Sequence, residues 1–410
     1  MTDGQQIGNH RKLGRFGPIM FIGQLGWAAL GAAAAPLLAV LVAGVAPADK
    51  VGSLALITTV GGVGATITMI FAGYLSDHTV SRYGPRVPWI IAGSLVASAG
   101  FAAMGLAKSI LLLTVVHLLY QIGINLMLGA FNAIPADYLD DSVLGKASAF
   151  GGAGYLVAQM LGSTVGATFV GRPRTGLAVI APITVICSFI VVKMLPPHPH
   201  CLQPEKNVSG SRALIWEKFR LPHDSQFWWV FVGRFLFIIS LFMTIQFQLY
   251  IATDRMGLGT SEAGRLVALN GVLLAIGAAL ATIITGPWSD HVHRRRPFVI
   301  AAPLLGALGI LPLILFDQAW ALSFFAITGG LAFGSYLSVD GALMIEVLPQ
   351  RKDSARDLGL LSAANSLPMV LAPGLGALLV KTVGYQGDFI IGAVLAILGS
   401  FCITRVTRVR

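Results

Sequence analysis

The chain has 410 residues, of which 55% are hydrophobic and only 11% charged, and its formal net charge is +10. Soluble proteins carry about 25% charged residues, so this composition excludes an ordinary soluble enzyme or binding module. The positive charge does not indicate nucleic-acid binding, because the sequence has no basic soluble domain with interleaved aromatic residues.

Twelve apolar segments are each long enough to cross about 30 Å of hydrocarbon as a helix. Six lie at 16–43, 53–76, 88–106, 109–134, 147–171 and 175–195. Six more lie at 226–253, 262–286, 297–316, 319–348, 357–380 and 384–404. The first is far longer than the about 7–15 residues of a signal-peptide core, so we expect it to be retained. The sequence therefore predicts an all-α integral membrane protein with twelve transmembrane helices.

Basic residues gather in alternate loops. If the N-terminus is cytoplasmic, cytoplasmic segments hold 20 of the 28 lysines and arginines and the outer loops hold seven, while Arg234 lies inside a segment. Loops rich in lysine and arginine stay on the cytoplasmic side of a membrane. We therefore expect both termini in the cytoplasm and a multi-pass protein of the plasma membrane.

Several landmarks recur in the second part of the chain. Ser-Asp-His at 76–78 returns at 289–291, each time followed by a basic turn and a Pro-aromatic pair. Pro135 and Pro349 each follow the fourth segment of their part. Duplicated halves are common in secondary carriers, which bind solute between the halves near the midplane. We expect six-helix halves at 1–195 and 226–410, joined by a cytoplasmic linker at 196–225.

The stretch 73–89, Gly-Tyr-Leu-Ser-Asp-His-Thr-Val-Ser-Arg-Tyr-Gly-Pro-Arg-Val-Pro-Trp, resembles the helix 2–3 signature of the major facilitator superfamily. Its Ser-Asp, Ser-Arg and Arg-x-Pro-aromatic order is similar to that of the sucrose–proton and glycoside–cation symporters. The stretch 289–298 resembles their triple-arginine form, and 339–359 resembles the tenth and eleventh helices of bacterial members. The resemblance implies the major facilitator fold, alternating access, and helices 1, 4, 7 and 10 around the solute. His78 and His291 depart from the usual basic residue after the aspartate.

The two Ser-Asp-His turns are candidate cytoplasmic gates. Each aspartate ends a helix, where it is able to accept hydrogen bonds from the N-terminus of the next helix and to pair with arginines. The resemblance implies gating for both turns, and we expect a glutamate near the end of the tenth helix to meet the arginines at 294–296. A static topological anchor is the alternative, because loop orientation alone accounts for the arginines. The candidate gate residues are Asp77, Arg86, Asp290, Arg296 and Glu346.

Polar side chains recur at helical spacing in two segments and suggest a cavity. Four in the fourth segment fall within an arc of about 80° at 100° per residue, and polar groups at membrane depth must face protein or water. Amides and hydroxyls with few charges suit a neutral, hydroxyl-rich solute, and an aromatic residue beside an amide suits stacking on a sugar ring. Hydrogen bonding between helices without a ligand is the alternative. The candidate cavity residues are Gln24, Trp27, His117, Gln121, Asn125, Asn132, Ser240, Thr244 and Gln248.

We expect three ionised side chains to lie at membrane depth, namely Arg234, Asp340 and Glu346. Arg234 and Asp340 each lie about 12–14 Å from the cytoplasmic end at 1.5 Å per residue, so they are able to pair. An unpaired intramembrane charge is expensive, and breaking the pair would let Asp340 take a proton. These two residues are our candidates for proton coupling, with a structural Arg–Asp clamp as the alternative.

We expect neither a metal nor a cofactor. His198-Pro199-His200-Cys201 lies in the proline-rich linker and is interpreted as a solvated spacer. The sequence has no Gly-x4-Gly-Lys-[Ser/Thr] phosphate loop. A cluster that loosely echoes the magnesium-binding aspartates of membrane prenyltransferases has the wrong spacing for them; its members are Asn132, Asp137, Asp141, Asp353 and Asp357.

The sequence therefore predicts a monomeric secondary active transporter of a small solute, coupled to protons or another cation. Its partners are the solute, the coupling ion and the lipid bilayer, with no nucleic acid. A sugar or glycoside is the leading solute. Export of a drug or metabolite by proton antiport is the alternative, and a prenyltransferase-like membrane enzyme is a remote one.

Overall fold

The computed structural model describes residues 13–196, 224–292, 295–347 and 354–406, and every regular element in these ranges is a helix. Helices satisfy their own backbone hydrogen bonds, which hydrocarbon requires. The helices of the first part are α1 (Phe16–Val45), η1 (Pro47–Asp49), α2 (Lys50–Asp77), α3 (Val87–Ala103), η2 (Met104–Leu106), α4 (Ile110–Phe131), α5 (Ile134–Tyr138), α6 (Asp141–Thr168), α7 (Pro173–Ile180) and α8 (Pro182–Met194). Those of the second part are α10 (Ser225–Gln246), α11 (Gln248–Tyr250), η3 (Ile251–Arg255), α12 (Thr260–Val292), α13 (Arg296–Leu315), α14 (Ala319–Val347) and α15 (Ser354–Thr404).

Local chemistry fixes several helix ends. Asp49 accepts a hydrogen bond from the backbone N–H of Gly52 at the start of α2, and Ser109 caps α4 through Leu112 in the same way. Such caps satisfy N–H groups that have no partner inside the helix. α15 bends at Gly384, whose φ of 76° lies in the left-handed region that favours glycine. The bend divides α15 into a first limb, 354–383, and a second limb, 385–404.

Ten stretches of the described residues are long and apolar enough to span a membrane. The sequence predicts twelve spans, and the two numbers differ at α6 and at α15. α6 is rich in glycine and small polar residues, and it packs against α1 and α12. The two limbs of α15 count once, as the stretch Ala364–Thr404. The element bounds also differ, since α6 begins at Asp141 rather than at 147.

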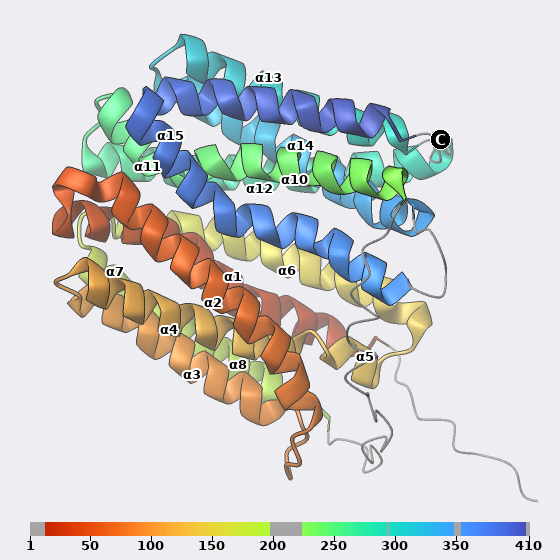
Figure 1. The fold of residues 1–410 in the computed structure, drawn as a ribbon. Coiled ribbons are helices and arrows are strands. Elements are labelled where there is room, and N and C mark those ends of the chain that lie inside the picture. Colours follow the sequence, from red (N-terminus) through yellow and green to blue (C-terminus); the bar gives the residue numbers. More distant parts are fainter. Residues whose placement is uncertain (1–12, 197–223, 293–294, 348–353, 407–410) are drawn as a thin grey trace, which may run out of the picture.

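The helices form two groups that meet along two seams. In Figure 1 the red-to-yellow helices of the first part lie on one side and the green-to-blue helices of the second part lie on the other. α6 contacts α12 across one seam, and α2 contacts α15 across the other. One buried apolar cluster contains residues from both parts, such as Leu37 and Leu249, whereas another around Phe16 and Ile134 belongs to the first part alone. We call these groups the first half and the second half.

Candidate functional site

A cavity of about 720 Å³ lies between the two halves. It is lined by α1, α2 and α4 of the first half and by α10 and the first limb of α15 of the second half. Volumes of about 300–1,000 Å³ are typical of small-molecule sites. None of its lining residues in the described part of the chain is Asp, Glu, Lys or Arg. Its polar lining residues are Thr58, Thr66, His117, Tyr120, Gln121, Asn125, Gln246 and Ser366.

His117 is the most informative polar group of this cavity. Its side chain is only 3% exposed, and neither ring nitrogen has a hydrogen-bond partner. The ring packs beside Tyr120, with ring centroids 5.7 Å apart, and against the backbone of α2 at Gly61. A buried polar group without a partner is costly, and native proteins usually satisfy it. The described protein groups therefore leave both ring nitrogens of His117 without a hydrogen bond.

Amide groups from both halves complete the polar lining. Gln121 and Asn125 follow His117 at four-residue intervals on α4, as the sequence spacing predicts, and all three line the cavity. Asn125 Nδ2 donates to the backbone oxygen of Gln121 over 2.9 Å, which fixes the orientation of that amide. Gln246, the last residue of α10, faces the cavity from the second half. The solute would therefore touch hydrogen-bonding groups on both halves.

The three polar residues expected on the seventh segment lie elsewhere. Ser240 is buried and donates to the backbone oxygen of Gly392 on α15 over 2.7 Å, so it joins two helices of the second half. Thr244 and Gln248 are also buried and do not line the cavity. α10 ends at Gln246 and the short α11 follows, so one helical phase does not extend from 240 to 248. Sequence spacing alone missed Gln246 for this reason.

Two further predicted residues line a separate cavity of about 470 Å³ within the first half. Gln24 of α1 and Asn132 at the end of α4 face it, together with Tyr155 of α6. Trp27 donates from its indole nitrogen to Gln24 Oε1 over 2.8 Å and packs on Tyr155, with ring centroids 5.6 Å apart. The expected pair of an aromatic residue and an amide is therefore present, but the indole of Trp27 contacts Gln24 and Tyr155 of the protein itself.

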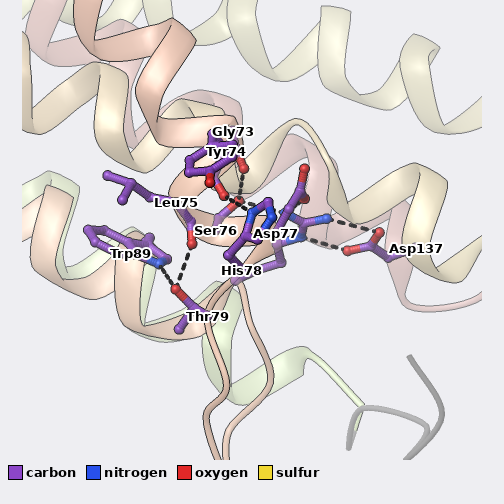
Figure 2. A network of polar contacts seen from close by, with 10 residues as sticks. Gly73, Tyr74, Leu75, Ser76, Asp77, His78, Thr79, Trp89 and Asp137 are labelled. Carbon is purple, nitrogen blue, oxygen red and sulfur yellow. Dashed lines mark hydrogen bonds and ion pairs between the residues drawn. The ribbon is translucent and has the colours of Figure 1, made fainter. Parts of the chain in front are cut away.

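Arg86, in the turn between α2 and α3, is the centre of a polar cluster with Ser76, Asp77 and Asp137; these three partners are labelled in Figure 2. Its Nε donates to Asp137 Oδ2 over 2.8 Å, and its Nη1 donates to Asp77 and Ser76. Burial lowers the pKa of Arg86, but the hydrogen bonds and charges of Asp137 and Asp77 outweigh burial and raise it. Every member belongs to the first half. Since Arg86 occupies both oxygens of Asp137, this aspartate is committed to the turn and not to a metal-bound diphosphate.

Neighbouring side chains stiffen the same turn (Figure 2). Trp89 donates from its indole nitrogen to Thr79 Oγ1 over 2.7 Å, and Thr79 donates to the backbone oxygen of Leu75. His78 packs on Tyr74, with ring centroids 4.2 Å apart, and its Nδ1 lies 2.9 Å from the Tyr74 backbone oxygen. His78, one of the two residues that depart from the superfamily pattern, therefore contacts its own helix.

The second turn and the expected coupling pair are described only in part. Arg296 donates from Nη2 to the backbone oxygen of Thr404 at the end of α15. Arg234 is 1% exposed, and its Nε donates to Asn365 Oδ1 on the first limb of α15. The remaining expected partners lie outside the residues whose side chains are described, as does the metal-like tract of the linker; they are Asp290, Asp340, Glu346 and His198–Cys201.

Contacts that the sequence analysis did not identify join the halves at the end opposite the α2–α3 turn. Lys50 Nζ lies 2.5 Å from Asp254 Oδ1, and Lys381 Nζ lies 2.8 Å from Asp49 Oδ1. The Tyr250 hydroxyl donates to the backbone oxygen of Ala39 on α1 over 2.8 Å. The Tyr385 hydroxyl adds a contact of 2.9 Å to Asp254 within the second half. We call this group the latch; its residues are Ala39, Asp49, Lys50, Tyr250, Asp254, Lys381 and Tyr385.

One buried carboxyl also escaped the sequence analysis. Asp388 lies in the twelfth expected segment. The sequence analysis named only Arg234, Asp340 and Glu346 as charges at membrane depth, and this set was incomplete. It is 1% exposed, and neither of its oxygens has a hydrogen-bond partner. The signal was present in the sequence, because an aspartate stands four residues after Gly384, directly before the apolar run that begins at Phe389.

Comparisons with known proteins agree with this architecture. The family model of the Major Facilitator Superfamily matches residues 16–278 and 265–410. An uncharacterised MFS-type transporter of Mycobacterium tuberculosis is 26% identical over 273 residues, which are 60% of this chain and 53% of the relative. The chain thus matches about half the length of that relative. The oxalate:formate antiporter of Oxalobacter formigenes is 26% identical over 365 residues, covering 81% of this chain and 78% of the antiporter.

Solved structures resemble the whole chain. A bacterial homologue of the human lysosomal transporter Spinster, inward-facing and occupied, superposes with a TM-score of 0.74 at 14% identity and 98% coverage of each chain. The nucleoside transporter NupG gives 0.72 at 16% identity, covering 95% of this chain and 99% of its own. A D-xylose–proton symporter gives 0.70 at 16% identity, covering 95% and 97%. The chain belongs to the major facilitator superfamily, as a multi-pass membrane protein whose relatives are transporters and not enzymes.

Proposed function

We propose that the chain is a secondary carrier that moves a neutral, hydroxyl-rich solute, with a sugar or glycoside as the leading class, by alternating access. The observation that carries this proposal is the cavity between the halves, which contains amides, hydroxyls and the unpartnered His117 and has no charged lining residue in the described ranges. Burying an anion there would leave its charge without a partner, which is costly. A neutral polar solute would satisfy the same groups at no such cost.

The proposed topology has twelve spans with both termini in the cytoplasm. α6 and the two limbs of α15 supply the spans beyond the ten that length and apolar composition identify. The α2–α3 turn is then cytoplasmic, as its basic residues favour. The latch lies on the outer face, where its contacts hold the halves together. We expect the protein in the plasma membrane as a monomer.

The same proposal assigns separate roles to the charged residues. Asp77 and Arg86, with Asp290, Arg296 and Glu346 in the second half, form the cytoplasmic gate. Arg234 and Asp340 couple transport to protons, and the burial of Arg234 supports an intramembrane partner for its charge. Asn365 is added to this group because it accepts a hydrogen bond from Arg234.

Uptake by purified protein in proteoliposomes tests the proposal. The panel contains neutral sugars and glycosides, a nucleoside, oxalate and a lipophilic cation, each with and without an imposed pH gradient. We expect uptake of a sugar or glycoside that a gradient drives uphill. One lost hydrogen bond is worth about 0.5–1.5 kcal/mol, so His117→Ala and Gln246→Ala should each raise KM by roughly 2–10-fold.

The matched control is Ser94→Ala, because Ser94 is buried on α3 and bonds only to its own helix at Ile91. This variant should keep the wild-type KM. Oxalate exchange without sugar uptake would replace the proposed solute by a carboxylate, which is the substrate class named for the Oxalobacter relative. Efflux of the lipophilic cation alone would instead support drug export by proton antiport.

A further inference from the structure

Asp388 is a buried acid without an ion-pair or hydrogen-bond partner among the described residues. It lies on the second limb of α15, one turn after the Gly384 bend, and both of its carboxyl oxygens are unpartnered in the described structure. An unpaired carboxylate in apolar surroundings costs far more free energy than the neutral acid. The site therefore favours a bound proton for as long as it stays closed to water.

The packing of α10 against the second limb of α15 sets the level of Asp388. Ser240 of α10 bonds the backbone of Gly392 on that limb. The two helices run in opposite directions. Thr244 is one turn after Ser240 and Asp388 is one turn before Gly392, so both lie one turn nearer the latch and at the same height. The Thr244 hydroxyl is also buried without a hydrogen-bond partner. Two unpartnered polar groups therefore lie at the same height in the second half, without a hydrogen bond between them.

The remaining surroundings of Asp388 are apolar and tight. A methyl group at Gly376, on the first limb of α15, would lie 3.5 Å from Asp388 Oδ1 and 2.8 Å from Cε2 of Phe247. Glycine at this position therefore lets the first limb approach both side chains. The Phe247 ring is 1% exposed, so it helps to exclude water from the carboxyl.

The charged and titratable groups of the latch, and Arg255 beside them, have partners of their own. Tyr385 is near enough to interact electrostatically with Asp388, but its hydroxyl donates to Asp254. Phe389, next to Asp388, packs under the Arg255 guanidinium at 5.0 Å. The partnered groups on the neighbouring elements are Tyr250 with Ala39, Asp254 with Lys50, Arg255 with Asp317, and Lys381 with Asp49.

We propose that Asp388 is a proton-binding site that controls the latch end of the carrier. The acid is neutral while the halves are closed at this end. When they separate, water reaches the carboxyl, the O–H bond breaks heterolytically, and the proton leaves to that water. The proposal rests on the alternating-access function above and adds a proton site other than Asp340.

Distance measurements between spin labels test the proposal without a known solute. The labels sit on Ala48→Cys in η1 and Ser261→Cys in α12, both exposed and on opposite halves, in full-length protein whose Cys187, Cys201 and Cys402 have been replaced. The closed state binds the proton more tightly, so raising the pH should favour the open state. Release of one proton changes the open-to-closed ratio by up to about tenfold per pH unit.

Asp388→Asn mimics the neutral acid and should keep the short distance at every pH, whereas Asp388→Glu should keep a pH dependence. Asp317→Asn is the matched control, because Asp317 is an exposed carboxylate at the same end and pairs within its own half. This control should titrate like the wild type. A pH response that persists unchanged in Asp388→Asn would overturn the proposal.

Infrared spectroscopy gives a second readout that does not depend on the Asn variant folding well. The C=O band of a protonated carboxyl should be present in the wild type at neutral pH and should move in Asp388→Glu. Failure of that band to move would also overturn the proposal. Wild-type uptake at fixed pH is measured in parallel. If the protein takes up solute but the distance between the labels does not depend on pH, the Asp388 site alone is rejected. If the distance depends on pH but no solute is taken up, the carrier function is rejected and the site is retained.

Discussion

Arg86 shares one guanidinium between two carboxylates that differ in their exposure to water. The Asp137 side chain is 13% exposed and that of Asp77 is 57% exposed. Exposed ion pairs contribute about 0–1 kcal/mol, whereas breaking a buried pair costs about 3–5 kcal/mol because the remaining charge loses its partner. The more buried Asp137 therefore carries most of the stabilising interaction, although the sequence motif draws attention to Asp77.

Substitution of the two carboxylates tests this difference at the α2–α3 turn. We expect Asp137→Asn to lower the free energy of unfolding by roughly 2–3 kcal/mol, below the fully buried limit, and Asp77→Asn by less than about 1 kcal/mol. Thermal unfolding of the detergent-purified variants measures both. Arg82→Ala in the same exposed turn is the control and should change the midpoint little. Equal losses for the two aspartates would contradict the assignment.

At the scale of the element, α6 and α12 meet across the halves through very small residues. A methyl group at Gly271 of α12 would lie 2.3 Å from Ser163 Oγ on α6, closer than non-bonded atoms approach. Small residues at such contacts allow helix backbones to approach each other in a membrane. The low apolar content of α6 has the same origin, since this helix contacts protein on two sides.

Gly271→Ala should therefore disturb the seam between the halves. We expect a loss of about 1–3 kcal/mol from overpacking and a lower uptake rate in proteoliposomes. Gly152→Ala on α6 is the matched control, because a methyl group there meets nothing within 4 Å, and it should leave stability unchanged or slightly raised. Normal stability and uptake in Gly271→Ala would mean that the seam has room that the structure does not indicate.

At the scale of the whole molecule, the latch joins the two halves through two ion pairs of unequal exposure. The side chains of Lys50 and Asp254 are 25% and 30% exposed, whereas those of Lys381 and Asp49 are 49% and 55% exposed. Thr58, the first polar lining residue of α2, follows Lys50 by about 12 Å of helix. The latch is therefore near the cavity but does not line it.

Neutralising substitutions should rank the two pairs. We expect Asp254→Asn to raise the population open at the latch end more than Asp49→Asn does, because water screens the second pair more strongly. Asn at position 49 can still cap α2, so that substitution isolates the charge effect. The distance between labels on Ala48→Cys and Ser261→Cys measures the population. A larger effect for Asp49→Asn, or no dependence on salt, would contradict the ranking.

The sequence predicts the positions of the helices well, because apolar length and turn residues are local properties. The α4 stripe is also local, and three of its four residues share the main cavity. Gln246 could not be predicted, since it depends on where α10 gives way to α11. The latch depends on which loops of the two halves meet, and the repeat does not specify this. The Arg234–Asp340 pair stays a prediction.

The contact between Tyr250 and Ala39 has a consequence for natural variation in this group of proteins. The tyrosine donates to a backbone oxygen, which every residue type possesses. Position 39 is therefore free to vary among small buried residues without loss of the bond, whereas position 250 must keep a hydroxyl at the end of a long side chain. In alignments of close relatives, we therefore expect position 250 to be constrained and position 39 to vary. A search for covarying pairs of positions would overlook this link between the halves.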